Sequence, residues 1–342
     1  NNLAWEKKKT YNVGIDLALF RNRLEFTAEW YKNTSEDLLY AVPVPEQAGV
    51  SNTTVTMNAA SMNNSGFEFS ATYRNRDHDF KYEVSANLST LRNRVTSLGF
   101  GTDSYISGSY ITKVGQEIGQ FYGWVYEGIA RTQEDLDNHA TQEGAQIGDC
   151  LYKDVNNDGK VDSEDQVVLG SGMPKINFGL NARFEYKRFD LSIATFGALN
   201  YHVSDDIYNS LNSCYGWGNK EVGMLEANRF SEDGSTYLSN VPRTYVTNSA
   251  SLGWNDLFSS RKIQNAAYWK IANVELGYNF PDKWFGKYVS DVRFYVSAQN
   301  LHTFTGYHGY NVDYAGGTFT PGYNFCSYPT ARTFMCGVHF TF

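Results

Sequence analysis

Apolar and polar residues alternate one by one in several long segments of this sequence. In residues 80–89, one face would carry Phe80, Tyr82, Val84, Ala86 and Leu88, and the other Lys81, Glu83, Ser85, Asn87 and Ser89. Alternation with a period of two predicts a β-strand that has one apolar and one polar face. The pattern recurs near residues 24–30, 67–74, 176–186 and 292–299, and no charged residue falls on the apolar side of these segments. Helical spacing is weak throughout.

The long strands are joined by connections of two contrasting lengths. We expect strands at about 8–20, 23–35, 65–75, 79–91, 120–129, 174–186, 188–200, 267–281, 291–303 and 331–342. Without the doubtful 120–129, the remaining nine are linked alternately by tight turns and by long loops at 36–64, 92–173, 201–266 and 304–330. Short turns on one side and long loops on the other are typical of outer-membrane barrels. We therefore assign 120–129 to an outer loop.

The composition excludes several other classes. The chain has 29 Lys and Arg against 37 Asp and Glu, and this net charge of −8 argues against nucleic-acid binding, which needs a basic surface. Aromatic residues make up 16% of the chain, too many for a disordered protein. No run of 18 apolar residues predicts a transmembrane helix, and a mean hydropathy of −0.46 is compatible with a barrel that puts only alternate residues in lipid. The predicted fold class is all-β: an antiparallel transmembrane β-barrel segment with long extracellular loops.

The chain ends and the cysteines add three expectations. The start at Asn1 shows no targeting segment, so the chain is expected to be either cytoplasmic or a mature or shortened form. The last strand alternates up to Phe342, and a terminal aromatic residue is a usual ending for an outer-membrane barrel. Cys150 and Cys214 fall in predicted outer loops, which leaves open an extracellular disulfide between them.

Seven motifs together resemble one family, the SusC/RagA-type TonB-dependent transporters. They stand in family order along the whole chain: N-L-A-W-E (2–6) with Y-N-V-G-I-D (11–16), Y-K-N-T-S-E-D-L-L (31–39), N-S-G-F-E (64–68), G-Q-F-Y-G (119–123), L-G-Y-N-F-P (276–281), N-L-x-x-F-T (300–305) and Y-P-T-A-R (328–332). Each motif alone is weak, and the set is specific. The family's signal peptide, TonB box, plug domain and earlier barrel strands have no counterpart here.

The resemblance implies a location, a function and partners. Residues 1–342 would be the C-terminal part of a transporter barrel of about 22 strands in the bacterial outer membrane. The whole transporter would import oligosaccharides or peptides, with a SusD-like surface lipoprotein as a lid. The TonB system would open the plug through the missing N-terminal region. No covalent chemistry is implied, and no nucleophile–base motif is readable, so we expect no enzyme.

A short acidic motif in the second long loop predicts a metal site. Residues 154–165 read D-V-N-N-D-G-K-V-D-S-E-D, a 12-residue pattern in which Gly159 occupies the sharp-turn position. Oxygen ligands at positions 1, 3, 5, 7, 9 and 12 suit calcium. The candidate ligands are Asp154, Asn156, Asp158, the backbone carbonyl of Lys160, Asp162 and Asp165. An acidic solvated loop with Asx-turns is the alternative.

Aromatic residues in the outer loops are the next candidates. They are Tyr215, Trp217, Trp254, Tyr307, Tyr310, Tyr314 and Tyr323. Such rings could stack on sugar rings or peptide side chains, form the interface with a lid lipoprotein, or belong to a lipid-boundary girdle. Charged residues on the polar strand faces, such as Arg74, Glu83 and Arg293, would line the lumen and pair with one another and with the plug.

Two other readings remain open from the sequence. A passive porin or adhesin would lack a plug and a lid partner. A secreted, calcium-stabilised carbohydrate-binding β-sandwich would also show alternating strands, but it would leave the very long loops unexplained.

Overall fold

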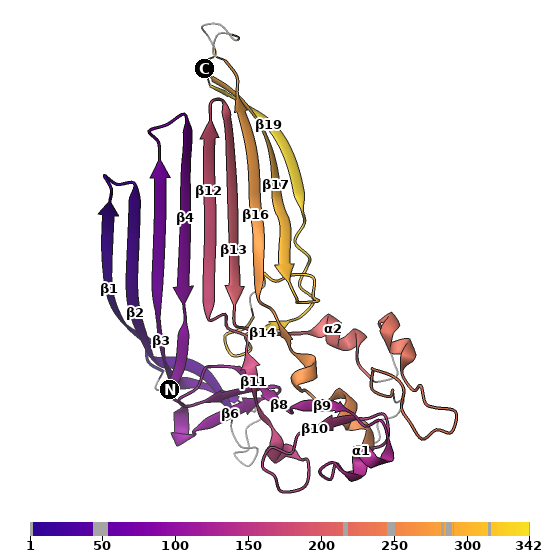
Figure 1. Cartoon of the computed structure of the whole chain (residues 1–342). Helices are drawn as coiled ribbons and strands as arrows, with labels where there is room; N and C mark the ends of the chain where they lie inside the picture. The colour runs from indigo at the N-terminus through magenta and orange to yellow at the C-terminus, as the bar shows by residue number, and fades with distance from the viewer. Residues whose placement is uncertain are drawn as a thin grey trace.

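Nine long strands form one antiparallel sheet, which we call the wall (Figure 1). The computed structural model describes residues 3–43, 54–214, 218–244, 250–281, 284, 289, 291–313 and 316–341. The strand order is β1-β2-β3-β4-β12-β13-β16-β17-β19, and β5 pairs with the outer part of β3. The bounds are β1 (Lys7–Leu19), β2 (Leu24–Pro43), β3 (Thr54–Asn75), β4 (Phe80–Thr90), β5 (Arg92–Ser97), β12 (Ile176–Tyr186), β13 (Phe189–Leu199), β16 (Tyr268–Asn279), β17 (Asp291–Thr305) and β19 (Thr333–Thr341). Each wall strand pairs with the next wall strand along the chain, which confirms the nine predicted strands.

The register places like residues side by side across the wall. One row of directly paired residues is apolar: Leu24, Tyr73, Val84, Ala182, Ile193, Val274, Ala298 and Phe334. The adjacent row is almost entirely polar: Glu25, Thr72, Ser85, Asn181, Ala194, Asn273, Gln299 and Thr333. Since neighbouring residues of a strand point to opposite faces, the wall has one apolar and one polar face over its whole width.

The apolar face is open. Phe80, Phe189 and Phe334 on this face are 47%, 54% and 70% exposed. Cys336, beside Val296, is exposed on the same face. A β-sandwich would cover such a face with a second sheet, and in the described residues the other sheets are small and lie beyond the end of the wall (Figure 1). The face is therefore suited to lipid, and the sandwich reading does not fit.

The connections sort by length to the two ends of the wall (Figure 1). Tight turns at 20–23, 76–79 and 187–188 lie at the end where β19 finishes. The long connections 91–175, 200–267 and 306–332 lie at the opposite end, and we call them the loop region. Its elements are β6 (Ser104–Ser107), β7 (Tyr110–Lys113), β8 (Gln120–Gly123), β9 (Tyr126–Ile129), α1 (Gln133–Asp137), β10 (Cys150–Tyr152), β11 (Val167–Ser171), β14 (His202–Asp205), α2 (Asp206–Leu211), β15 (Gln264–Asn265) and β18 (Tyr323–Asn324), with 3-10 turns η3 (Ser163–Asp165), η4 (Val222–Glu226), η5 (Ala250–Asp256) and η6 (Ser260–Lys262). A further 3-10 turn, η2 (Gly99–Gly101), lies just beyond β5.

Two expectations about the strands have definite outcomes. Residues 120–129 form β8 and β9 in the small sheets of the loop region, which confirms that they lie outside the wall. The predicted loop 36–64 is wrong in large part, because β2 and β3 continue pairing well past the expected ends. Irregularities between Ser35 and Leu39, where Asp37 has a φ of 58°, shift the register there. A bulge breaks the period-two pattern without ending the ladder.

Helices contribute little to this structure. Within the described ranges, no helix combines the length and the apolar character that crossing a membrane requires.

Candidate functional site

The polar face of the wall carries ion pairs between neighbouring strands. Arg74 on β3 contacts Glu25 at 2.6 Å and Glu83 at 2.8 Å, so it links β2, β3 and β4. Arg293 on β17 contacts Asp190 at 2.5 Å and Glu275 at 2.7 Å, linking three strands in the same way. These contacts match the predicted pairing of lumen-facing charges with one another. The face presents a hydrated, mixed-charge surface, which suits a water-filled interior.

The loop region has a core of its own. Cys150, Tyr152 and Val161 are buried, and Trp124, Tyr126, Ala140, Trp254 and Leu257 pack against them. Beside this cluster, Asp149 is 1% exposed and forms a two-pronged ion pair with Arg243 at 2.5 and 2.9 Å. The amide of Asn255 donates to Asp149 at 2.7 Å and its oxygen accepts from the Cys150 N–H at 2.7 Å. Each of these buried polar groups thus has a partner.

The cysteines of the loop region are free thiols in the structure. Cys150 and Cys214 are both fully buried, and they lie close enough to influence each other electrostatically. Burial raises the pKa of the Cys150 thiol to about 12 and that of Cys214 to about 11. The disulfide that the sequence left open is not formed in this structure, where both residues are buried as small apolar groups in the core.

The acidic loop 154–165 folds around its own carboxylates. Asp154 accepts hydrogen bonds from the N–H groups of Asn157, Asp158 and Gly159, at 2.6 to 3.3 Å. At the other end of the loop, Asp165 is fully buried and accepts from the N–H groups of Val155, Asn156 and Asp162. Gly159 has a φ of +87°, as the sharp turn requires. The first and last predicted ligands therefore both point into the loop.

The remaining predicted ligands lie on the exposed side of this loop. The Lys160 Nζ lies 2.8 Å from the Asp162 carboxylate and 3.6 Å from that of Asp158. The hydrogen bond to Asp162 raises the pKa of Lys160, and the same bond lowers the pKa of Asp162. In the part of the chain that the structure describes, no three His, Cys, Asp or Glu side chains gather as a metal-binding group. The donor set, which includes Asn156 and a backbone carbonyl, still suits a hard cation, so the calcium site remains a prediction.

Apart from Trp254, the predicted aromatic candidates divide into three groups. Tyr215, Trp217 and Tyr314 lie outside the described residues. Tyr310 and Tyr323 are 62% and 40% exposed on the loop surface, where a stacking role stays a prediction. Tyr307 is only 6% exposed, and its hydroxyl donates to Asp205, which also caps α2. The expectation of a surface role for Tyr307 is wrong, because its phenol satisfies a buried carboxylate.

Trp254 lines a hollow that the sequence did not predict. We call it the tryptophan hollow and define it by Trp124, Glu143, Asp162, Ser163, Trp254 and Leu257. Its volume is about 640 Å³, within the ~300–1,000 Å³ range of small-molecule sites. The sequence analysis did not select Trp124. Its position directly after the G-Q-F-Y-G motif could have marked it as a candidate residue.

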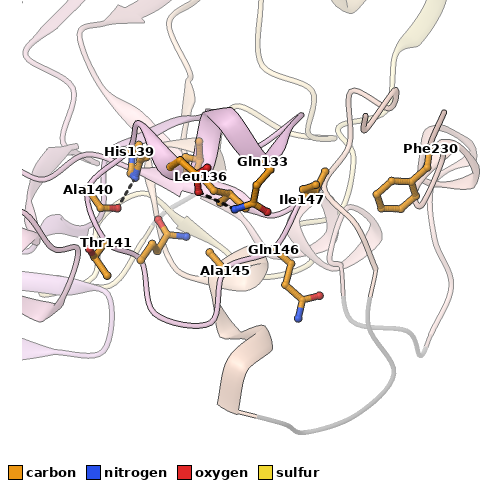
Figure 2. Close-up of a pocket in the computed structure, with 12 residues that line it drawn as sticks. Gln133, Leu136, His139, Ala140, Thr141, Ala145, Gln146, Ile147 and Phe230 are labelled. Carbon is orange, nitrogen blue, oxygen red and sulfur yellow. Dashed lines mark hydrogen bonds between the residues drawn. The ribbon is translucent and has the colours of Figure 1, made fainter. Parts of the chain in front are cut away.

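A second hollow is lined by other residues of the same 142–146 turn (Figure 2). We call it the glutamine hollow and define it by Gln133, Leu136, His139, Gln142, Gln146 and Phe230. Its polar groups serve the loop itself: Gln133 donates to Asp137, His139 bonds the Ala140 carbonyl, and Gln142 bonds the backbone of β10.

Comparison with known proteins agrees with this architecture. The family model described as TonB dependent receptor-like, beta-barrel, matches residues 1–323. A TonB-dependent receptor, P3, of Formosa agariphila is 31% identical over 361 residues, covering 100% of this chain and 35% of that protein. The TonB-dependent receptor SusC of Bacteroides thetaiotaomicron is 26% identical over 348 residues, covering 100% of this chain and 32% of its own.

A solved structure extends the agreement to the fold. The RagAB peptide transporter matches with a TM-score of 0.80 at 22% identity, covering 98% of this chain and 35% of that one. This chain thus spans about a third of the length of the curated relatives it matches. From the family match over nearly its whole length, we conclude that the chain belongs to the TonB-dependent receptor-like β-barrel family of the outer membrane, and that it is similar to SusC and shares its fold with the RagAB transporter.

Proposed function

We propose that this chain forms part of the barrel of a TonB-dependent importer that carries oligosaccharides or peptides across the outer membrane. The observation that carries the proposal is the two-faced wall: an open apolar face for lipid and an ion-paired polar face for an aqueous interior. The names of two similar proteins, the receptor SusC and the RagAB peptide transporter, support this class of function.

The edges of the wall support the proposal that further strands complete the barrel. The strand order leaves β1 and β19 at the two edges, and all 13 residues of β1 are exposed. An unpaired backbone N–H or C=O in lipid costs several kcal/mol, as a rough figure. We propose that both edges pair with strands outside these 342 residues, in a barrel of about 22 strands around a plug.

Two partners follow from this function. The loop region lies at one end of the wall with a compact core, and it offers a platform for a SusD-like surface lipoprotein that would close over captured substrate. The TonB system would act on the plug from the opposite side, using the proton-motive force. Substrate would then pass along the polar face of the wall. The charged side chains there are already paired with one another, so they would bind a neutral or mixed-charge solute only weakly. The function is transport without covalent chemistry.

Uptake in the source bacterium tests the proposal. Cells should take up labelled oligosaccharides or peptides at a rate that falls at least tenfold when the chain is deleted or when an uncoupler collapses the proton-motive force. Uptake that is insensitive to the uncoupler would favour the passive porin instead.

Purification gives an independent check. The polypeptide that carries the Y-P-T-A-R motif should come from detergent-solubilised outer membrane with a denatured mass far above 38.6 kDa and with a lipoprotein in similar amount. A 38.6 kDa polypeptide in the soluble fraction would contradict the barrel proposal.

We also propose that the 154–165 loop binds calcium as a structural ion. Asp154, Asn156, Asp158, Asp162 and Asp165 would supply side-chain oxygens and Lys160 its backbone carbonyl. Support comes from the loop geometry, with Gly159 in the turn and the Asp154 and Asp165 carboxylates directed into the loop. The ion would stiffen a segment that is joined to Thr141 by backbone hydrogen bonds of 2.9 Å at Gly159 and Val161.

Metal analysis tests the calcium proposal. The purified protein should retain about one calcium that chelator removes, and Asp158→Ala should lose it. Asp233→Ala is the matched control, since Asp233 is an exposed loop carboxylate that bonds only to nearby serines. Equal calcium content in all three proteins would contradict the assignment.

A further inference from the structure

Four segments that are far apart in the sequence converge on the tryptophan hollow. Trp124 follows β8, Glu143 lies in the 142–146 turn, Asp162 and Ser163 belong to the acidic loop, and Trp254 lies in η5. A hollow formed only by loose packing would be expected to close when its side chains rotate. In the tryptophan hollow, hydrogen bonds to neighbouring segments hold the lining side chains in place.

Hydrogen bonds fix both indole rings. The Trp124 Nε1–H donates to the Asp162 carbonyl at 2.9 Å, and the Trp254 Nε1–H donates to the Glu143 carbonyl at 2.8 Å. Tyr152, which is buried, also holds Trp254: its hydroxyl donates to the Trp254 backbone carbonyl, and the rings of Tyr152 and Trp254 lie 6.2 Å apart. Because their N–H groups are already used, the two tryptophans offer a ligand only apolar ring surface. A preorganised surface loses little side-chain entropy on binding.

The polar side chains at the hollow can all accept hydrogen bonds, and the Ser163 hydroxyl can also donate one. Glu143 and Ser163 are exposed, and the Asp162 carboxylate is already paired with Lys160 at 2.8 Å. No Lys, Arg or His lines the hollow, which disfavours an anionic ligand. The Lys160 ammonium offsets the Asp162 charge, which disfavours a cation. The ligand that fits is neutral, with a flat apolar face and hydroxyl donors around its edge.

A pyranose ring has this chemistry, since its C–H groups form a flat face and its hydroxyls point outward. We propose that the tryptophan hollow binds a pyranose unit of a neutral oligosaccharide. The role of this binding rests on the proposed function: the hollow would capture substrate before import. It would thereby favour oligosaccharides over peptides as the substrate. Binding itself can be measured without import.

Binding measurements on the detergent-purified outer-membrane protein test the inference. The probes are neutral glucan, xylan, mannan and galactan hexasaccharides. Their binding is measured by calorimetry and by tryptophan fluorescence. At least one probe should bind, and Trp254→Ala should weaken its binding at least tenfold. Phe230→Ala, in the neighbouring glutamine hollow, should leave the affinity within twofold of the unchanged protein.

A second variant guards against misfolding of Trp254→Ala. Gly253 lines the hollow, and a Cβ at this position meets no atom within 4 Å, so Gly253→Gln narrows the hollow without disturbing the core. It should also weaken binding at least tenfold, while Cys150 and Cys214 stay protected from alkylation.

The outcomes separate this inference from the proposed function. Binding that depends on Trp254 and Gly253 supports it, even if uptake assays fail. Absence of binding by all four probes, equal binding by the variants, or equally strong Trp254-dependent binding of tetramethylammonium would overturn it. Import could still hold in those cases, with capture elsewhere.

Discussion

The wall and the loop region place their apolar side chains in different surroundings. In the described residues, all buried apolar side chains except Ala60, Ala198 and Val292 lie in the loop region or in β5 beside it. The wall instead turns large residues such as Phe189 and Phe334 outward. A sheet whose apolar face meets lipid needs no core of its own, whereas loops in water must build one.

The two regions should therefore respond to different substitutions. The wall depends on strand pairing and on the match of its face to lipid. The loop region depends on close packing and on the pairing of buried polar groups such as Asp149 and Arg243.

The largest effect should come from breaking the buried ion pair of the loop region. Arg243→Ala leaves the Asp149 carboxylate buried and without its partner, which typically costs about 3–5 kcal/mol. Hydrogen exchange of peptides from 140–152 and 237–257 should accelerate at least a hundredfold, while wall peptides keep their rates. Arg183→Ala is the control, since its pair with Glu185 is largely exposed and should cost about 0–1 kcal/mol. Equal acceleration in the wall would show that the two regions are not independent.

A charge on the lipid face should produce the next largest effect. Leu180 is 44% exposed on the apolar face of β12, and Asn181 follows it on the polar face. Leu180→Arg should destabilise the membrane-inserted protein by about 2–4 kcal/mol in denaturant titrations. Asn181→Arg should have little effect, because that face is hydrated. If the two variants behaved alike, the assignment of the faces would be refuted.

A methyl group at a close backbone approach should have a smaller effect. A Cβ on Gly66 of β3 would overlap the Thr90 carbonyl, where β4 ends and β5 begins. Gly66→Ala should cost about 1–3 kcal/mol and lower the assembled fraction in the outer membrane. At Gly179 the added Cβ meets only the movable end of the Asn87 side chain. Gly179→Ala should therefore assemble better than Gly66→Ala, and the reverse order would contradict the geometry.

The smallest change in stability should come from the titration of the buried thiols, because it occurs well above neutral pH. An unfolded thiol loses its proton near pH 9, whereas the folded Cys214 and Cys150 hold theirs to about pH 11 and 12. The folded state thus binds more protons above pH 9, and the stability of the loop region should fall as pH rises through that range. Maleimide should label the exposed Cys326 quickly at pH 8 and leave the two buried thiols unmodified. Rapid labelling of all three would contradict a closed core.

The alternation of apolar and polar residues made most strands of the wall and their two faces predictable. Alternation in residues 80–89 is local and fixes both faces of β4 without reference to any neighbour. The extension of β2 and β3 was missed because the irregularities near Asp37 interrupt the alternation while hydrogen bonding continues. The acidic loop was found for the same reason as the strands, since its spacing is contiguous in sequence.

The candidate binding residues were less predictable, because loops acquire contacts from distant segments. Tyr307 and Trp254 look alike in the sequence as aromatic loop residues. The structure buries Tyr307 against Asp205, 102 positions away, and leaves Trp254 half-buried beside Glu143, 111 positions away. Only the folded loop region distinguishes these two surroundings.

The sequence by itself therefore determined the two-faced strands, their number and order, and the side on which the long loops lie. Those properties depend on a period of two and on the lengths of connections, which are read along the chain. The tertiary structure alone decided which loop residues are core and which line a hollow. Burial in the loop region comes from packing between segments such as 124, 143, 162 and 254, whose proximity no local pattern encodes.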